Sequence, residues 1–375
     1  MSRLGSLGQR MYRGEVSYDF IGRTKTWYTI SAIILLISIG ALLFRGLNLG
    51  IEFKGGADFS LPNATCSVQQ ARDVAEEATG AQTIVTVSNT GTVRVQTETL
   101  TPDASSTLAG TLGEACGVAK DDIKYQVVGP TWGAEISKKA LQGLAVFLLL
   151  LTLFLTIYFE WRMAVAALVA LAHDLIITIG IYALTGLEVT PASVIGLLTV
   201  LGYSLYDTVV VFDKVKENTR GITGQSIMTY DEAANLAVNQ TVVRSINTSI
   251  VAVLPIFSII FVGAFFLGAG TLLDLSVALA IGMIAGTFSS LFIATPVLVQ
   301  LKARTAEMKS LSSRVHARRV QAAKKAGSVS DSDSDTDGAR AGKAIATPAA
   351  LAVDAGPMER VQPRKQSRSK RKKGS

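Results

Sequence analysis

The sequence contains few of the residues from which most enzyme sites are built. Its 375 residues include only two cysteines and two histidines, and these do not have the spacing of metal ligands. It also lacks a glycine-rich phosphate loop, a dinucleotide-binding glycine pattern and a serine-nucleophile elbow. We therefore expect that the chain is not an enzyme and uses no metal and no cofactor other than protons as a coupling ion.

Charged residues are scarce as well. They make up only 17% of the chain, and hydrophobic residues make up 49%, whereas soluble proteins carry roughly a quarter charged residues. The net charge of +7 is unevenly distributed, because residues 302–375 carry +11 and the rest carries −4. Repeated apolar runs of about 20 residues are long enough to cross a bilayer. The composition predicts a polytopic α-helical membrane protein.

Six apolar runs are predicted to span the membrane. They cover residues 27–45, 141–159, 163–184, 192–212, 243–266 and 272–300, so that helices 2–6 lie within residues 139–300. The connections 160–162 and 213–242 contain Lys or Arg, whereas the short connections 185–190 and 267–271 contain none. By the positive-inside rule, residues 1–26 and the C-terminus then lie in the cytoplasm. A cleaved signal peptide is the alternative for the first run, but no small-residue cleavage site follows it.

The long polar segment between the first two spans, residues 46–138, is predicted to form a domain outside the membrane. Its pattern predicts strands at 51–61, 83–87, 92–97 and 123–128 and helices at 68–78 and 102–115. This order is typical of a ferredoxin-like α+β fold. Cys66 and Cys116 fall at helix ends that lie close together in that fold. We expect a disulfide between them, and two unpaired thiols are the alternative.

Asp207 lies inside the fourth predicted span, where an acid costs roughly 2.5–3.5 kcal/mol and is usually functional. Arg244 lies at a comparable depth in the fifth span, so we expect the two charges to meet. Movement of Arg244 relative to Asp207 would switch the carboxylate between binding and releasing a proton. The alternative is a static ion pair that holds the two helices together. The sequence predicts a proton relay of Asp207, Arg244 and Asp174.

Other polar groups in the spans are expected to support this relay. They are His173, Tyr203, Ser204, Tyr206, Asn247 and Thr248. For His173, a hydrogen bond within the helix bundle with no functional role is the alternative. Small residues that recur over residues 277–290 of the last span predict close helix packing.

Residues 301–375 are predicted to form a disordered, basic cytoplasmic tail. An acidic low-complexity run covers residues 328–337, and a basic run covers residues 363–375. Segments of this composition cannot bury enough apolar surface to fold alone. The basic run is suited to anionic lipid or ribosomal RNA, and a merely solvated run is the alternative.

Several motifs resemble the SecD/SecF family, the auxiliary membrane components of the bacterial Sec translocase. They are GLNLGIEFKGG at residues 46–56, VGPTWGAEISKKA at 128–140, Ala172-His173-Asp174, GYSLYDTVVVFDKVKEN at 202–218 and the stretch 239–249. Their order, and the single outer domain, are typical of the SecF branch. Glu52 stands where Asp is usual in the family, and Tyr206 stands where many relatives carry Asn.

This resemblance implies half of an RND-type transporter, whose six helices pair with six from SecD. The resemblance also implies a multi-pass protein of the bacterial cytoplasmic membrane that acts with the SecYEG channel and the SecA ATPase. In the family, the residues at Asp207 and Arg244 are implicated in using the proton motive force to help unfolded polypeptides leave the channel. An RND-type exporter of lipids or small molecules and a non-transporting scaffold are the alternatives.

Overall fold

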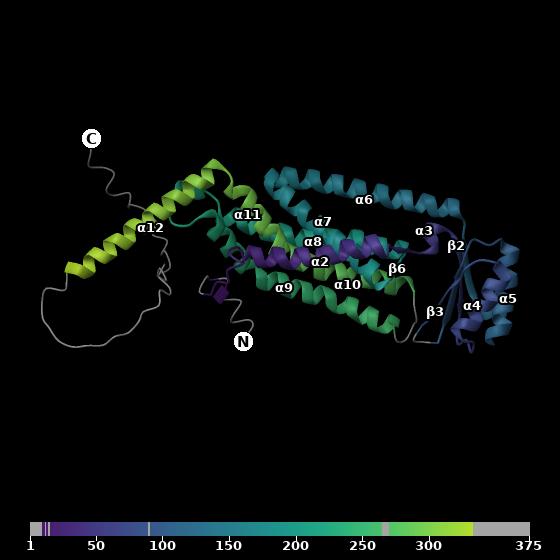
Figure 1. The fold of residues 1–375 in the computed structure, drawn as a ribbon. Coiled ribbons are helices and arrows are strands. Elements are labelled where there is room, and N and C mark those ends of the chain that lie inside the picture. The colour runs from purple at the N-terminus through teal and green to yellow at the C-terminus, as the bar shows by residue number, and fades with distance from the viewer. Residues whose placement is uncertain (1–9, 12, 14–15, 89–90, 265–269, 333–375) are drawn as a thin grey trace, which may run out of the picture. The chain divides into compact units, whose positions relative to one another are not determined.

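The computed structural model describes residues 10–11, 13, 16–88, 91–264 and 270–332 (Figure 1). Within these residues, six helical spans are long and apolar enough to cross a membrane. They are α2 (Thr24–Phe44), α6 (Pro130–Tyr158), α7 (Trp161–Thr185), α8 (Pro191–Asn218), α9 (Tyr230–Val262) and a composite of α10 (Thr271–Ser289), a π-helical turn (Ser290–Ala294) and α11 (Thr295–Ala303). The predicted polytopic fold with six spans is confirmed.

Two of these helices begin well before their apolar runs. Helix α9 starts at Tyr230 rather than at residue 243, because Thr229 and Glu232 form a reciprocal capping box there. Helix α6 starts at Pro130 rather than at residue 141, with proline in the favoured first turn. Hydropathy marks the part of a helix that lies in lipid, whereas caps decide where the helix begins. The predicted end of the fifth span, residue 266, lies outside the described residues.

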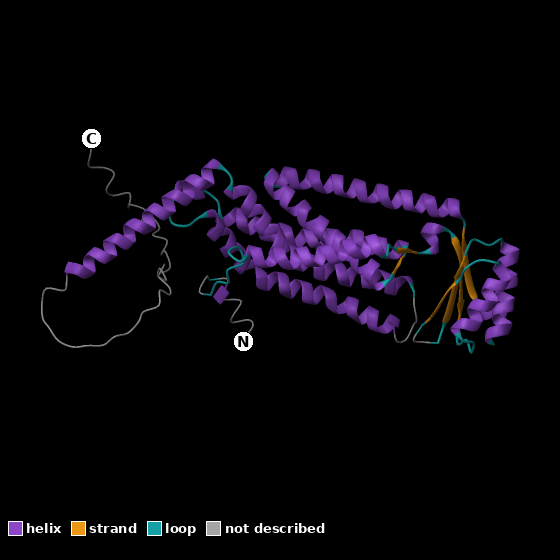
Figure 2. Cartoon of the chain, viewed as in Figure 1, coloured by secondary structure: helices purple, strands orange, loops and turns teal. Residues whose placement is uncertain are grey.

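A four-stranded antiparallel sheet lies at one end of the membrane helices (Figures 1 and 2). It consists of β2 (Gly56–Leu61), β3 (Ile84–Val87), β4 (Val93–Thr97) and β5 (Lys124–Val128), with α4 (Val68–Thr79) and α5 (Pro102–Cys116). We call these six elements the sheet domain. The spatial order β3-β4-β2-β5 places β4 between β2 and β3, the two strands that α4 connects, which is the ferredoxin-like arrangement.

The two faces of this sheet differ in character. Phe59 and Val95 point into an apolar core with Leu108 and Leu112 of α5, and all four side chains are buried. Alternate residues on the same strands point to the opposite face. That face carries polar groups, among them Arg94 of β4.

The predicted strand 51–61 is wrong in its first half. Residues Ile51–Lys54 form a short helix, α3, and only the second half becomes β2. The change of direction between them occurs at Gly55 and Gly56, whose φ angles are +80° and +147°. Side chains other than glycine rarely adopt such angles. Just before α3, β1 (Asn48–Leu49) pairs in parallel with β6 (Glu188–Val189), a contact that the sequence pattern did not indicate.

Cys66 and Cys116 form a disulfide in the sheet domain, with their Cα atoms 4.5 Å apart. Cys66 directly precedes the N-cap of α4, and Cys116 is the last residue of α5. The backbone N–H of Thr65 also donates to the carbonyl oxygen of Cys116, at 3.0 Å. The disulfide and the hydrogen bond together hold the start of α4 against the end of α5.

The predicted disordered tail must be corrected at its start. Residues Ala306–Ser332 form a helix, α12, in which Met308, Leu311 and Val315 are buried in the same apolar cluster as Tyr230. Arg319 forms an ion pair with Glu232 of α9 at 2.7 Å. The prediction was wrong because it used the composition of the whole tail, whereas the start of the tail is a short amphipathic stretch with its few apolar residues on one face. The basic run 363–375 lies outside the described residues.

Removal of the disulfide tests its contribution to the sheet domain. The double variant Cys66→Ala/Cys116→Ala should lower the unfolding free energy of this domain by about 2–4 kcal/mol, because the cross-link restricts the unfolded chain. Hydrogen exchange of the β2 and β4 amides in the purified protein measures the change. Either single variant should lose nearly as much, and reductant should destabilise only the unmodified protein. A reductant-insensitive exchange pattern contradicts the prediction.

Candidate functional site

Asp207 lies on α8 with its side chain turned into the helix bundle, and only 6% of the residue is exposed. Two serine hydroxyls donate to its carboxylate. Ser245 of α9 donates to Oδ1 at 2.5 Å, and Ser290 of the π-helical turn donates to Oδ2. The carboxylate is thus held by two neighbouring helices at once. Hydrogen bonds of this kind satisfy a group that would otherwise be very costly to bury.

Asp174 occupies an equivalent environment on α7 and is only 1% exposed. Its Oδ2 accepts from Ser204 of α8 at 2.5 Å and from Ser289 of α10 at 2.8 Å. The Nδ1 atom of His173 lies 3.2 Å from Oδ1 of Asp174. The other ring nitrogen of His173, Nε2, is buried without a hydrogen-bond partner among the described residues.

The two carboxylates are connected through consecutive residues of the sixth span. The hydroxyl of Ser289 donates a hydrogen bond to Asp174, and that of Ser290 donates to Asp207. These serines occupy the point where α10 changes to a π-helical turn, a distortion that is frequent at functional sites. A small displacement of this segment would change the hydrogen bonding of both carboxylates.

Close packing of α8 against α10 allows such short side chains to reach across. Gly286 faces Ser204, and a methyl group at Gly286 would lie 2.7 Å from Cβ of Ser204. Gly282 faces Val200 in the same way one turn earlier. Any larger residue at these glycines would separate the helices. The predicted close packing of residues 277–290 therefore also positions the hydroxyl donors.

Arg244 does not form the predicted ion pair with Asp207. Among the described residues, its guanidinium donates to the phenol oxygen of Tyr206 at 3.4 Å, and Ser245, the next residue, faces Asp207 instead. Arg244 and Tyr206 are both exposed on the outer surface of the bundle. Ser245 rather than Arg244 faces Asp207 because adjacent residues on a helix differ by about 100° in direction, and hydropathy does not reveal this angle. The charge of Arg244 still acts on Asp207 without direct contact.

The other predicted supporting residues are distributed unevenly. Ser204 is part of the Asp174 site, whereas Asn247 is exposed. Thr248 bonds back to the carbonyl oxygen of Arg244 on its own helix, and Tyr203 packs against the apolar cluster around Ile256.

Sequence reasoning missed three donors to the carboxylates: Ser245, Ser289 and Ser290. In the sequence, Ser289 and Ser290 indicate only close helix packing, as part of the small-residue stretch 277–290. The available signal was a pair of consecutive hydroxyls deep in an apolar span, where polar groups need partners.

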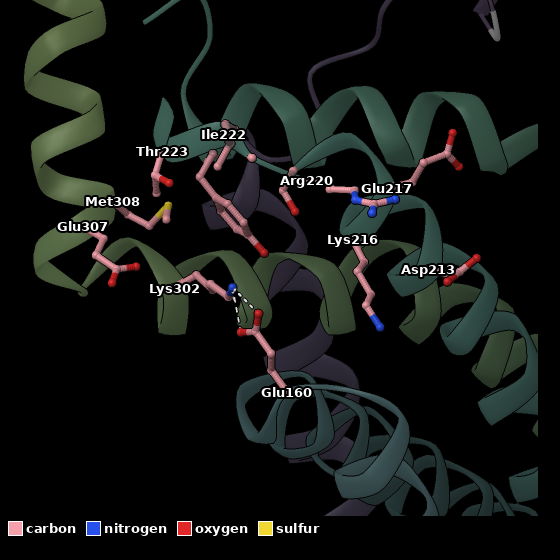
Figure 3. Close-up of a pocket in the computed structure, with 13 residues that line it drawn as sticks. Glu160, Asp213, Lys216, Glu217, Arg220, Ile222, Thr223, Lys302, Glu307 and Met308 are labelled. Atoms are coloured by element: carbon pink, nitrogen blue, oxygen red, sulfur yellow. Dashed lines mark hydrogen bonds and ion pairs between the residues drawn. The ribbon is translucent and has the colours of Figure 1, made fainter. Parts of the chain in front are cut away.

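A cavity of about 710 Å³ lies at the C-terminal end of α8 (Figure 3). It is lined by acidic and basic side chains, and Lys302 forms an ion pair with Glu160 at 2.6 Å in its wall. Asp207, Arg244 and Asp174 do not line this cavity. It is therefore separate from the two buried carboxylates.

Two family models match this chain, one over most of the membrane helices and one over the segment that follows the first span. The family described as "Protein export membrane protein SecD/SecF, C-terminal" matches residues 109–304, and the "SecD/SecF GG Motif" matches residues 40–57. The first match covers the five spans that follow the sheet domain. The second covers the end of α2, the β1 strand and α3.

Similar whole chains carry related names. A "Protein translocase subunit SecF" from Streptomyces coelicolor is 51% identical, covering 87% of each chain. One from Mycobacterium tuberculosis is 44% identical, covering 90% of this chain and 78% of the relative. The crystal structure of SecDF from Thermus thermophilus, described as a translocon-associated membrane protein, is 28% identical with a TM-score of 0.69. It matches 77% of this chain, which spans only 39% of that structure.

A double-mutant cycle tests the specific pairing of serines and carboxylates. Ser290→Ala and Asp207→Asn should be non-additive, with a coupling of about 1–3 kcal/mol, because one hydrogen bond to a buried charged group joins them. Ser289→Ala provides the matched control, since its hydroxyl serves Asp174 and should couple to Asp207→Asn far more weakly. Unfolding of the purified protein in detergent measures each free energy. Equal couplings for the two serines would contradict the assignment.

Proposed function

Since the chain belongs to the SecD/SecF family of protein-export membrane proteins, we propose that it is a non-catalytic accessory subunit of the Sec protein translocase. In this proposal it acts with SecD and uses the proton motive force to promote late steps of polypeptide export. The SecYEG channel, the SecA ATPase and the unfolded exported polypeptide are its further proposed partners. The coupling ions are protons, and no other cofactor is involved.

The observation that carries the proton-coupling proposal is the pair of buried carboxylates. Asp207 and Asp174 lie in helices that are apolar enough to cross a membrane, and each has two serine donors rather than a permanent cation. A basic side chain in contact would neutralise such a carboxylate permanently. Hydroxyl groups hold it in place while leaving it able to bind a proton.

The proposed coupling step is a movement of the sixth span relative to α8. In the present arrangement Ser290 donates to Asp207. When this donor is withdrawn, the buried carboxylate loses part of its stabilisation and is neutralised by a proton. Return of the donor favours release of that proton. If the two arrangements open to opposite sides of the membrane, each cycle carries a proton across it.

The proposed orientation places the sheet domain outside the cell and both termini in the cytoplasmic compartment. The connection between α7 and α8, next to the sheet domain, contains no Lys or Arg. At the other end of the helices, Arg162 lies in the first turn of α7 and Arg220 lies in the connection after α8. This distribution follows the positive-inside rule for a bacterial cytoplasmic membrane.

The exposed face around Arg244 is the proposed contact with SecD. An arginine in a membrane span is costly where it meets lipid. Among the described residues, the only hydrogen-bond partner of the Arg244 guanidinium is the Tyr206 hydroxyl, and its charge also acts on Asp207. SecDF chains from Thermus thermophilus and Bacillus subtilis match this chain over 40% and 38% of their lengths. The rest of such a chain supplies a second half that could cover this face. Anionic lipid near the basic tail is a further proposed contact.

Export of a secreted reporter tests the role of Asp207. Cells whose only copy carries Asp207→Asn should lose the stimulation of export, because the neutral amide can neither release nor bind the coupling proton. Asp213→Asn is the matched control on the same helix, since Asp213 is exposed, and it should export normally. Membrane abundance of each variant is measured by immunoblot. Normal export by a normally abundant Asp207→Asn protein would exclude proton coupling at this site.

Association with SecD tests the role of Arg244. Arg244→Leu should weaken co-purification of the two subunits by about tenfold or more, because the partner's polar group would lose its charged contact. Arg220→Leu removes the same charge from an exposed position after α8 and should leave association unchanged. If Arg244→Leu co-purifies as well as the unmodified protein, this face is not the contact.

A further inference from the structure

A second cavity, of about 800 Å³, lies between the polar face of the sheet domain and the ends of the membrane helices. On one side of it are Asp58 and Arg94 of the sheet, and on the other are Thr190 and Asp274 at the ends of α8 and α10. Glu52 of α3 also lines it. The cavity is therefore the gap across which the sheet domain and the membrane helices interact.

Glu188, on the membrane side, forms hydrogen bonds to the sheet domain. Glu188, on β6 between α7 and α8, accepts from Nη1 of Arg94 at 2.6 Å and from Nε2 of Gln96 at 2.8 Å. Arg94 also donates to Asp58 through Nε at 2.5 Å. Glu188 thus uses one carboxylate oxygen for each of two neighbouring donors on β4.

Glu52 adds a third carboxylate to this cluster. A methyl group at Gly50 would lie 2.6 Å from Oε2 of Glu52 and 3.1 Å from Oε1 of Glu188, so these two oxygens are separated by no more than the sum of those distances. Oε2 of Glu52 is buried and has no hydrogen-bond partner among the described residues. Three acids therefore lie near one guanidinium, and the unpaired oxygen of Glu52 lies beside Glu188.

This charge imbalance has a direct electrostatic consequence. Burial raises the pKa of Glu52 above its ordinary value, and repulsion from Glu188 and Asp58 raises it further. A hydrogen bond from a backbone N–H and the attraction of Arg94 offset only part of the rise. Arg94 itself stays charged, because its bonds to Asp58 and Glu188 outweigh burial and raise its pKa. Glu52 therefore binds a proton at a higher pH than an ordinary glutamate does.

Glu188 lies close to the beginning of α8, so this cluster is connected to that helix. Two residues later Thr190 caps α8, and its hydroxyl donates to Asp274 of α10 at 3.2 Å. Helix α8 then runs without interruption from Pro191 past Asp207. A pull on Glu188 therefore acts on the beginning of the same helix that holds the buried carboxylate.

We propose that Glu52, Glu188 and Arg94 form a proton-sensitive latch between the sheet domain and α8. The latch is closed while Glu52 holds a proton, and it opens when Glu52 ionises and repels Glu188. Opening breaks the contact between Arg94 and Glu188 and frees the beginning of α8 from the sheet domain. Glu188 and Glu52 are positioning residues in this proposal, because they act on Asp207 only through α8.

The direction of the pH dependence follows from the raised pKa of Glu52. The closed latch gains stability from the protonated form, which is fully present below the ordinary glutamate pKa. This stability is lost as the pH rises through the raised value. The other charged groups that line the cavity are Asp58 of β2, Arg94 of β4, Lys124 of β5 and Asp274 of α10. Of the charged groups nearby, Glu188, Arg94 and Asp58 act directly on Glu52.

Spin labels placed across the cavity can report the state of the latch. Thr86→Cys on β3 and Thr271→Cys on α10 provide exposed sites on its two sides, and the two native cysteines are occupied by their disulfide. The full-length chain is studied in lipid nanodiscs from about pH 4 to about pH 8, which spans ordinary and raised glutamate values. Pulsed electron paramagnetic resonance gives the label separation at each pH.

In the unmodified chain the two spin labels should lie close together at low pH. As the pH rises, a growing fraction of molecules should show a longer distance between the labels. For each unit by which the pKa of Glu52 differs between the closed and the open latch, the ratio of closed to open molecules changes by about tenfold across the titration. Glu52→Gln should stay closed throughout, and Arg94→Gln should be open even at low pH. Glu77→Gln, an exposed glutamate on α4, should titrate like the unmodified chain.

Two results would overturn the proposal. One is a separation that does not change with pH in the unmodified chain, and the other is a Glu52→Gln variant that still opens as the pH rises. The opposite effects expected of Glu52→Gln and Arg94→Gln distinguish a latch from general loss of structure. The test requires neither SecD nor export, so it stands or fails independently of the proposed function.

Discussion

A carboxylate inside a membrane span must find hydrogen-bond donors within the protein, and the arrangement of these helices depends on that requirement. Asp207 and Asp174 are both satisfied by serine hydroxyls from neighbouring helices. A hydroxyl sits close to its own backbone, so it reaches a carboxylate on another helix only when the helices nearly touch. The carboxylates thus demand close helix packing, and the donors hold α7, α8, α9 and the sixth span in register.

The glycines of α10 meet this demand. Gly282 and Gly286 bring α10 against Val200 and Ser204 of α8, so that the following serines face both carboxylates. Ser289 and Ser290, consecutive residues at the start of the π-helical turn, donate to different carboxylates. Because the donors for both sites come from one short segment, any rearrangement of that segment couples their protonation. A pair of independent carboxylates on separate helices would not have this property.

The sequence was sufficient for the six spans, for the succession of strands and helices in the sheet domain and for placing Asp207 and Asp174 within apolar spans, since each depends on composition or period. It was insufficient for orientation around a helix axis, which placed Ser245 rather than Arg244 beside Asp207. It also missed the early start of α9, which depends on a cap rather than on hydropathy. The packing of α12 escaped notice because three apolar residues on one face are a weak signal in a charged segment.

The tether to the sheet domain and the carboxylate sites are linked because they use the same two helices. Thr190 at the beginning of α8 bonds to Asp274 at the beginning of α10, and the serines near the end of α10 bond to the acids deeper in the bundle. The glycine contacts between these points leave little room for one helix to tilt alone. A displacement of the sheet domain that pulls on Glu188 must therefore either move α8 and α10 together past α7 and α9, or break the bond at Asp274. The first movement changes the donors of both carboxylates, whereas the second leaves them intact, so the strength of the Thr190–Asp274 contact decides how much of the domain's motion reaches them.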